Sequence, residues 1–206
     1  MSFDVIVSQA LKISPWFIQG IFWVGLVPQV IKNFNQKSVN GLSSLMLFGY
    51  FNGYLATTYY SYCLDLPLAY KVITPLSLAT VSIMLGQHFF YDGKFNSMIY
   101  YLISILIAIS FIPIAIKHTN FVGNLFGWTS MTIWMTYQIP QVAKIYSTRS
   151  VVGFSFFLIL VNGLGNLSEV VLSSLLGLPI QSVLSGIRGM MISSIFMMQF
   201  FLYSKA

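Results

Sequence analysis

Apolar residues in this chain form seven long runs separated by short polar breaks. Each run has about 20 mostly apolar residues, the length that a helix needs to cross a bilayer. The period-two alternation typical of membrane β-strands is absent from these runs. The pattern therefore predicts an all-α integral membrane protein with seven transmembrane helices, at residues 13–33, 43–63, 70–91, 98–116, 121–146, 153–176 and 179–203.

Composition and charge agree with this prediction. Hydrophobic residues make up 57% of the 206 residues and charged residues only 7%, whereas a soluble domain has about 25% charged residues. The net charge of +6 is scattered along the chain, so we interpret it as a signal of membrane orientation and expect no nucleic-acid partner. The single cysteine, Cys63, excludes an internal disulfide. No group of potential ligands predicts a metal site or another cofactor.

Lysine and arginine residues in the loops predict the orientation of the chain. One side of the predicted bundle carries six basic residues and the other side carries three. Because cytoplasmic loops are enriched in these residues, we expect the first side in the cytoplasm, the N-terminus outside and the C-terminus cytoplasmic. The six residues are Lys32, Lys37, Lys94, Lys144, Arg149 and Lys205, and the three are Lys12, Lys71 and Lys117.

The chain repeats itself at a spacing of 112 residues. Between residues 16–91 and 128–203, 21 of 76 positions are identical. Shared membrane composition alone would not align the tryptophan, glycine, proline and glutamine positions that are among them. The first three predicted helices are thus repeated as the last three, with the fourth between them.

This repeat predicts the organisation of the whole protein. Three spans invert the direction of the chain and the fourth restores it, so the two triplets have the same orientation. We expect a first repeat at 1–91, a connector with the fourth helix at 92–127 and a second repeat at 128–206, a 3+1+3 arrangement. Parallel repeats of this kind are found in transporters, with the substrate site near the bilayer midplane where the repeats meet.

A Pro-Gln pair lies near the same end of the first and fifth predicted helices, at Pro28 and Gln29 and again at Pro140 and Gln141. Proline removes one helical hydrogen bond and clashes with the carbonyl four residues earlier. In lipid the freed carbonyl needs a new partner, and the neighbouring glutamine amide is a suitable donor. One such proline usually only shapes a helix, but two copies in a repeat favour a hinge or gate at all four residues.

Polar residues also lie deep in the sixth and seventh predicted helices. Asn162, Asn166 and Glu169 share one helical face, and Arg188 lies at a similar depth in the last helix. Charged residues at this depth usually face the bundle interior or a water-filled cavity. Three interpretations are open: an ion pair between Glu169 and Arg188, an Arg188 that binds a substrate carboxylate, and a Glu169 that takes up a proton.

In the first repeat, Tyr50 and Asn52 lie within the second predicted helix. Tyr50 is the repeat equivalent of Asn162, so the two repeats present unlike polar groups to each other. Amides donate and accept hydrogen bonds, as phenols do, which suits a neutral or zwitterionic solute. We expect substrate binding by Tyr50, Asn52, Asn162, Asn166 and Arg188, and an interhelical hydrogen bond is an equally good explanation for Asn52.

The paired Pro-Gln motifs, each followed by S-V-x-G-[LF]-S, resemble the PQ-loop family. That superfamily includes the SWEET sugar transporters, the cystinosin-like lysosomal amino-acid exporters and the KDEL receptor. The resemblance covers nearly the whole chain and implies a seven-helix transporter. Cystinosin-like members carry aspartates at the positions of Asn162 and Ser193, and SWEETs carry asparagines at those of Ser77 and Gly189. Neither set is intact, so Glu169 is the deep carboxylate left for proton coupling.

These observations predict an alternating-access transporter of a small polar metabolite. An amino acid or similar zwitterion is the first candidate and a sugar the second. A sorting receptor that binds a peptide without transport is the alternative from another class, and the short stretch after Tyr203 argues against it. No Ser-His-Asp set or G-x-S-x-G motif predicts an enzyme. A bacterial inner membrane is expected rather than a lysosomal one, and monomer and homo-oligomer are both open.

Overall fold

The computed structural model describes residues 3–39, 42–93, 95–152 and 155–204, with side chains from residue 12 onward. Gly41, Gly153, Lys94 and Lys205, which support the predicted repeat and orientation, lie outside the described residues. In chain order the elements are α1 (Phe3–Gln36), α2 (Ser44–Cys63), α3 (Leu68–Asp92), the 3-10 turn η1 (Phe95–Ser97), α4 (Met98–Ser110), α5 (Ile112–Lys117), α6 (Thr119–Thr136), α7 (Ile139–Thr148), α8 (Phe156–Leu175) and α9 (Ile180–Tyr203).

The seven predicted spans correspond to these helices, and two of the spans are divided. The fourth span consists of α4 and α5, which are separated at Phe111, just before Pro113. The fifth consists of α6 and α7, which are separated just before Pro140. In both cases the proline lies in the first turn of the new helix, where its missing N–H removes no hydrogen bond. The first helix begins at Phe3, ten residues earlier than the predicted span.

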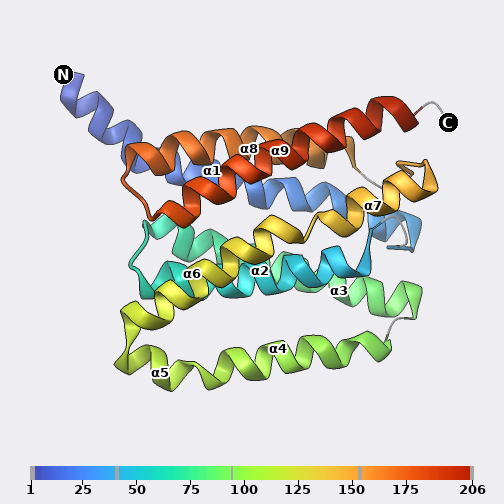
Figure 1. Cartoon of the computed structure of the whole chain (residues 1–206), viewed down its shortest axis with the longest axis horizontal. Helices are drawn as coiled ribbons and strands as arrows, with labels where there is room; N and C mark the ends of the chain where they lie inside the picture. Colours follow the sequence, from blue (N-terminus) through green and yellow to red (C-terminus); the bar gives the residue numbers. More distant parts are fainter. Residues whose placement is uncertain (1–2, 40–41, 94, 153–154, 205–206) are drawn as a thin grey trace.

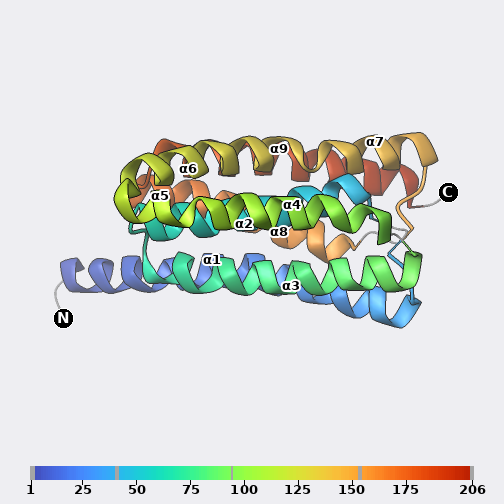
Figure 2. The same cartoon turned by 90° about the horizontal axis from the view of Figure 1, so that it is seen from below.

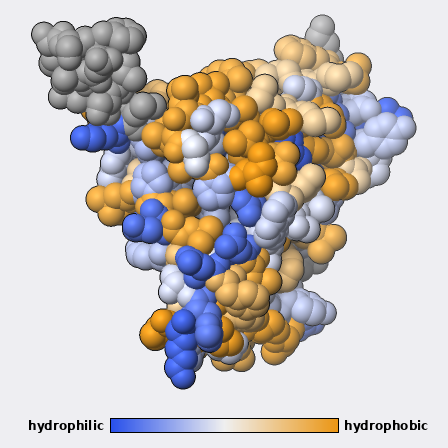
Figure 3. Space-filling view, turned by 60° about the vertical axis from the view of Figure 1, so that its left-hand side comes forward, coloured by the Kyte–Doolittle hydropathy of each residue, from blue (hydrophilic) through white to orange (hydrophobic). Residues whose placement is uncertain are grey.

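Within the described residues, five helical segments are individually long and apolar enough to cross a membrane: Lys12–Gln36, Leu68–Asp92, Phe95–Lys117, Phe156–Leu175 and Ile180–Tyr203. The less apolar α2 and the divided α6–α7 complete the set of seven. Figure 3 shows hydrophobic residues over much of the flank of the molecule and hydrophilic residues gathered toward the end that faces the viewer. This distribution is the one expected of a multi-pass membrane protein.

Both repeats pack their three helices in the same order. In the first repeat α3 lies between α1 and α2, and in the second α9 lies between α8 and α6–α7. The repeats meet along two seams, α2 with α6 and α1 with α8, which close a ring of six spans. α1 and α6–α7 run in the same direction (Figure 1), and α4 lies outside the ring beside α2 (Figure 2). The predicted 3+1+3 arrangement is therefore confirmed.

The repeat extends to individual hydrogen bonds. Gln87 Nε2 in α3 donates to the Val30 carbonyl in α1 at 3.1 Å, and the equivalent Gln199 Nε2 in α9 donates to the Val142 carbonyl in α7 at 2.9 Å. Each bond joins the segment after the Pro-Gln pair to the third helix of its own repeat. The two triplets therefore share an equivalent contact between these segments.

The two ends of the ring differ in the size of their buried apolar clusters. We call the end with the connections 64–67 and 176–179 the short-loop end, and the end nearer Pro28 and Pro140 the Pro-Gln end. The Pro-Gln half holds the thicker apolar layer, which includes Leu26, Met46, Leu47, Val81, Met84, Leu85, Leu158, Ile159 and Phe196. The short-loop end holds a smaller buried cluster of Tyr60, Leu66 and Tyr70.

Candidate functional site

A cavity of about 110 Å³ lies where the two repeats meet. It reaches from the middle of the bundle toward the short-loop end, and α1, α2, α3, α6, α8 and α9 all contribute to its walls, as do the residues at the α6–α7 junction. The apolar layer of the Pro-Gln half lies beneath it. This is the position predicted from the repeat, because parallel-repeat transporters bind their substrates at the repeat interface near the midplane.

Most of the residues predicted to bind substrate line this cavity. Tyr50, Asn162, Asn166 and Arg188 are among the lining residues, and Glu169 joins them. Asn52 does not line it, and its amide donates instead to the Phe48 carbonyl one turn earlier at 2.9 Å. α2 presents Tyr50, Tyr54 and Thr57 to the cavity, and Asn52 lies two residues from Tyr50, about 200° around the helix. The prediction for Asn52 was wrong because depth alone does not fix the direction of a side chain.

Glu169 joins the two repeats through neutral partners. Its Oε1 accepts a hydrogen bond from the Tyr70 hydroxyl at 2.8 Å, and its Oε2 accepts one from Gln19 Nε2 at 3.2 Å. Ser173 Oγ donates to the same carboxylate at 3.4 Å. Glu169 and Arg188 do not pair with each other, so of the three open interpretations the ion pair is the one that this structure does not contain. The two residues lie at similar depth, but each side chain is held by a different set of neighbours.

Arg188 is held at the other side of the cavity, where α6 gives way to α7. Its Nη1 donates to Gln138 Oε1 at 2.7 Å, and its guanidinium lies 5.2 Å from the centre of the Tyr137 ring. Among the described residues, Arg188 Nε, the Tyr50 hydroxyl and Gln181 Oε1 have no hydrogen-bond partner although they are buried. The cavity therefore offers one guanidinium N–H, one phenol and one amide oxygen to a bound molecule.

Aromatic side chains form one wall of the cavity. The rings of Tyr50 and Tyr137 lie 4.7 Å apart, those of Tyr54 and Trp134 4.9 Å apart, and those of Trp134 and Tyr137 5.0 Å apart. All three pairs meet edge to face, a favourable geometry for aromatic rings. Trp134 Nε1 donates to Thr57 Oγ1 at 2.9 Å, which joins α6 to α2 across one seam.

Sequence reasoning missed several of these residues, although a signal was present for some. Extending the equivalence of Tyr50 and Asn162 by one turn leads directly to Tyr54 and Asn166, and then to Thr57 and Glu169, which all line the cavity. The same face of α2 and of α8 thus supplies equivalent positions. Gln19 and Tyr70, which hold Glu169, also have equivalents in the lining, Met131 and Ser182, but neither of these was a predicted site residue from which the equivalence could be extended.

Asn166 packs directly against the backbone of α9. A Cβ atom added to Gly189 would lie 1.9 Å from Asn166 Oδ1, which is far inside van der Waals contact. Glycine at 189 therefore creates the space that this amide occupies. The cavity wall at this point is formed by a side chain of α8 rather than by one of α9.

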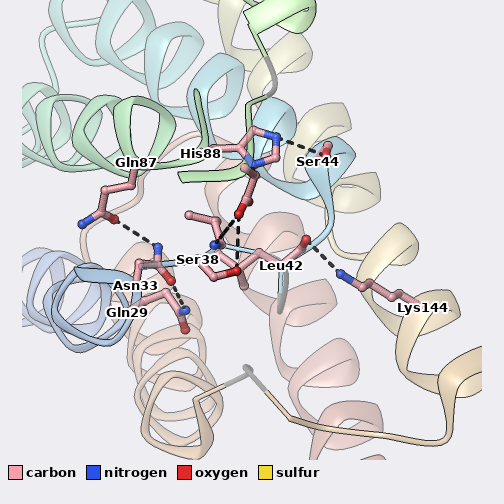
Figure 4. Close-up of polar contacts among 10 residues, drawn as sticks. Gln29, Asn33, Ser38, Leu42, Ser44, Gln87, His88 and Lys144 are labelled. Atoms are coloured by element: carbon pink, nitrogen blue, oxygen red, sulfur yellow. Dashed lines mark hydrogen bonds and ion pairs between the residues drawn. The ribbon is translucent and has the colours of Figure 1, made fainter. Parts of the chain in front are cut away.

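A second group of polar contacts lies at the Pro-Gln end (Figure 4). Gln29 Nε2 donates to Asn33 Oδ1 at 2.8 Å, and Asn33 Nδ2 donates to Gln87 Oε1 at 3.1 Å. Gln141 Oε1 accepts a hydrogen bond from the Ser43 N–H of the other repeat at 2.8 Å. These glutamines thus join helices and repeats, a role that the predicted donation to the freed proline carbonyl did not include.

The same end contains an arrangement that the sequence analysis did not expect. His88 Nδ1 lies 3.1 Å from Asp92 Oδ2, and His88 Nε2 lies 3.3 Å from Ser44 Oγ. A Ser-His-Asp chain of hydrogen bonds is therefore present, with His88 and Asp92 one turn apart in α3 and Ser44 44 residues earlier in the chain. The Asp92 carboxylate also accepts from the Val39 N–H at 3.2 Å, so this cluster ties the α1–α2 connection to α3.

Comparisons with known proteins agree with the fold and the repeat. The sequence profile of the PQ loop repeat matches residues 10–70 and 122–182, two segments at the same 112-residue spacing that together cover more than half of the chain. A solved structure of a eukaryotic SWEET transporter superposes with a TM-score of 0.70 over 100% of both chains, at 15% sequence identity. The two comparisons thus agree on a chain with two PQ loop repeats and the fold of that structure.

One curated relative also matches. An uncharacterized protein of Schizosaccharomyces pombe is 24% identical over an alignment of 155 residues. The alignment covers 70% of this chain and 55% of that protein. The chain therefore spans about half the length of this relative.

Proposed function

This chain belongs to the PQ-loop repeat family, and on that premise we propose that it carries a small zwitterionic metabolite, with amino acids as the first candidates, across a membrane by alternating access. The observation that carries the proposal is that Glu169 and Arg188 both line the cavity without pairing with each other. An acidic and a basic group are thus both available to one bound molecule.

The chemistry of the cavity matches the two ends of an amino acid. A guanidinium group binds a carboxylate through charge-assisted hydrogen bonds, which are stronger than neutral ones. Arg188 Nε has no partner among the described residues, so it is ready to donate to such a carboxylate. Glu169 provides the complementary site for an ammonium group, or for a proton when the substrate is neutral. Asn162 and Asn166 line the same cavity, and an amide group can both donate and accept.

A sugar is the second candidate substrate. The edge-to-face wall of Tyr50, Tyr54, Trp134 and Tyr137 together with the two asparagines favours a flat polyhydroxylated molecule. The solved structure with the same fold is that of a SWEET transporter. A sugar would use the aromatic and amide groups and leave the two charged residues with their present partners.

Alternating access requires that each end of the ring opens in turn. In this structure the thick apolar layer closes the Pro-Gln end below the cavity, and the Tyr60, Leu66 and Tyr70 cluster lies at the other end. We take Pro28, Gln29, Pro140 and Gln141 as residues of the gate at the Pro-Gln end. With the predicted orientation, this gate faces the cytoplasm and the short-loop end faces outward.

A ligand screen followed by uptake tests the proposal. Purified protein is heated with each member of an amino-acid panel and a sugar panel, because a ligand that binds the folded state raises the melting temperature. Hits are then offered to proteoliposomes. Stabilisation and saturable uptake by amino acids would support the first candidate, and the same result with sugars alone would support the second. Binding without uptake would favour a receptor, and no hit with no uptake would overturn the transport proposal.

The bilayer in which the protein resides is tested separately. The predicted location is a bacterial inner membrane, and fractionation of the source cells followed by immunodetection of the chain would check it. Recovery in a different membrane would change the location but not the proposed chemistry of the cavity.

A further inference from the structure

The α1–α2 connection is fixed to α3 of its own repeat (Figure 4). The Asp92 carboxylate, at the end of α3, accepts from the Val39 N–H at 3.2 Å and from the Ser38 hydroxyl at 3.3 Å. His88 contacts the same carboxylate and also reaches Ser44 at the start of α2. The side chains of His88 and Asp92 are only 4% and 3% exposed. The connection, the start of α2 and the end of α3 therefore form one unit.

α7 of the other repeat closes against this unit through a few polar contacts. Lys144 Nζ donates to the Leu42 carbonyl at 3.0 Å, and Gln141 Oε1 accepts from the Ser43 N–H at 2.8 Å. Lys144 also attracts the Asp92 carboxylate electrostatically. Water can replace hydrogen bonds of this kind at an open end. Movement of α7 also takes the buried Ile145 out of the apolar cluster and breaks the bond from Gln199 to the Val142 carbonyl.

α7 is also separated from α6 by a break that α1 lacks. α1 continues through Pro28 as one helix, whereas α6 ends at Thr136 and α7 begins at Ile139. The break contains Tyr137 and Gln138, whose equivalents in α1 are Gly25 and Leu26. Leu26 is 1% exposed within the apolar layer, so α1 is held at the corresponding point by packing. The same motif thus lies in a continuous packed helix in one repeat and after a break in the other.

The break is connected to the cavity. Gln138 Oε1 accepts from Arg188 Nη1 at 2.7 Å, and the Tyr137 ring lies next to the same guanidinium. A substrate carboxylate at Arg188 competes with the neutral Gln138 amide, and it is the stronger partner because its hydrogen bonds are assisted by charge on both sides. Loss of the Gln138 contact removes a restraint on the two residues that join α6 to α7.

We propose that α7 is the moving arm of the gate at the Pro-Gln end and that Arg188 transmits the arrival of an anionic group to it through Gln138. The α1–α2 connection, fixed by Asp92, is the stop against which α7 closes. This one-sided gate rests on the proposed transport function. It differs from a symmetric bend at Pro28 and Pro140, because α1 stays with its own repeat while α7 moves.

The repeat supplies a matched pair of distances to test this. Ala143 in α7 is equivalent to Ile31 in α1, and Leu202 in α9 is equivalent to Phe90 in α3. All four are exposed, so spin labels at these positions disturb little packing. Cys63 is first replaced by serine so that only the introduced cysteines carry labels. Double electron–electron resonance in liposomes then measures two distances between labels, one from position 143 to position 90 and one from position 31 to position 202. A moving α7 predicts two distances for the first pair and one for the second.

Two other outcomes would overturn the proposal. Equal changes in both pairs would mean that whole repeats rock as rigid bodies, and a single narrow distance in both pairs would mean that α7 stays docked. Neither measurement needs a substrate. If α7 moves but the protein shows no uptake, the gate proposal stands and the transport function is rejected. If the protein shows uptake but α7 does not move, the transport function stands and the gate proposal is rejected.

Substitutions then test the link to the cavity. Gln138→Ala removes the amide from the break without adding a side chain that could pack as Leu26 does, and it should raise the ratio of long to short Ala143–Phe90 distances by about tenfold, the factor expected for loss of a hydrogen bond to a charged group. An unchanged ratio would reject the Arg188–Gln138 link.

Pro140→Ala, which allows α6 and α7 to join into one helix, should remove the long distance. Asn52→Leu, which copies Leu164 of the other repeat and lies outside the cavity lining, is the control and should change neither distance.

Discussion

The first repeat contributes aromatic and hydroxyl groups to the cavity, and the second contributes amides and charge. Three successive cavity-lining positions of α2 have repeat equivalents that line the cavity in α8. The equivalent pairs are Tyr50 with Asn162, Tyr54 with Asn166, and Thr57 with Glu169. In the third helices, Leu76 is the equivalent of Arg188. The positions are the same in the two repeats and the chemistry is different.

This difference shows how a symmetric ring holds an asymmetric molecule. A cavity lined by two identical repeats would bind a substrate equally well in two orientations related by the axis. Here both deep charges, Glu169 and Arg188, come from the second repeat, and the first repeat supplies the two closer donors to the carboxylate, Gln19 and Tyr70. A zwitterion therefore has one favoured orientation. Exchanging residues between equivalent positions is the direct way to test this division.

The largest effect is expected from Arg188→Leu, which gives α9 the residue of α3. Loss of a charged hydrogen-bonding partner should weaken binding of a carboxylate-bearing substrate by about 3 kcal/mol, or about 100-fold. Calorimetry on a ligand found by the thermal screen measures this, with Asn52→Leu as the control. Undiminished affinity would show that Arg188 only holds Gln138.

The next largest effect is expected from Gly189→Ala. The added Cβ collides with Asn166 Oδ1, and displacement of that amide should lower the free energy of unfolding by about 2 kcal/mol, as overpacking in cores does. Ser77→Ala at the equivalent position is the control and should change it by less than about 0.5 kcal/mol, because the Ser77 hydroxyl has no partner among the described residues. Comparable melting temperatures for the two variants would contradict the predicted collision.

A smaller effect is expected from Glu169→Gln. The amide keeps the shape of the side chain and removes its charge, so affinity for a substrate with an ammonium group should fall by about 1.4 kcal/mol, or tenfold. Affinity for a neutral sugar should stay the same. A loss that is equal for charged and neutral ligands would assign Glu169 to the structure of the short-loop end, where it joins Tyr70 and Gln19.

The smallest effects are expected in the two short connections. Gly177 and Asp65 are equivalent, and both have a left-handed backbone, with φ of 60° and 52°. Gly177→Ala should lower the free energy of unfolding by about 1 kcal/mol, because a Cβ is strained in this conformation. Asp65→Gly should be nearly neutral, since it relieves the same strain and removes an exposed pair with Lys71. Melting temperatures of the two variants measure the difference, and a larger loss for Asp65→Gly would reverse the ranking.

The Asp65 pair also has a pH dependence whose sign is fixed. The hydrogen bond from Lys71 lowers the pKa of the Asp65 carboxyl below its usual value. A depressed carboxyl pKa stabilises the fold at neutral pH, and this contribution is lost as the pH falls through the lowered pKa. The melting temperature of Asp65→Gly should therefore fall slightly less than that of the unsubstituted protein as the pH is lowered. An equal fall in both proteins would show that the pair contributes nothing.

The fold could be predicted from the sequence because the bilayer leaves few choices. A chain that crosses lipid must satisfy its backbone internally, so long apolar runs become helices, and the predicted spans match α2, α3, α8 and α9 within three residues. The repeat then fixed the relative direction of the triplets. What it could not fix was the outcome at the two prolines. Pro28 and Pro140 share a motif, but α1 stays continuous while α6 ends at Thr136, and only Pro140 follows a residue that bonds to a deep arginine.

The site was predicted in part, for a related reason. Position along the chain gives the depth of a residue in the bilayer, and Asn162, Asn166 and Arg188, which were chosen by depth, line the cavity. Their binding of a substrate stays a prediction. Rotation about the helix axis and the identity of neighbours come only from packing. Similar depth allowed an ion pair between Glu169 and Arg188 as one interpretation, but the carboxylate bonds instead to Gln19, which lies 150 residues away in the sequence.

The outlying position of α4 has a consequence for how such a chain can arise and be divided. The ring closes through the contacts of α1 with α8 and of α2 with α6, and none of these depends on the covalent passage through the fourth span. That span acts as a return path, which brings the second triplet to the same face of the bilayer as the first. A half-length ancestor would need only to meet another copy of itself side by side, and the two halves of the present chain should assemble when synthesised as separate polypeptides.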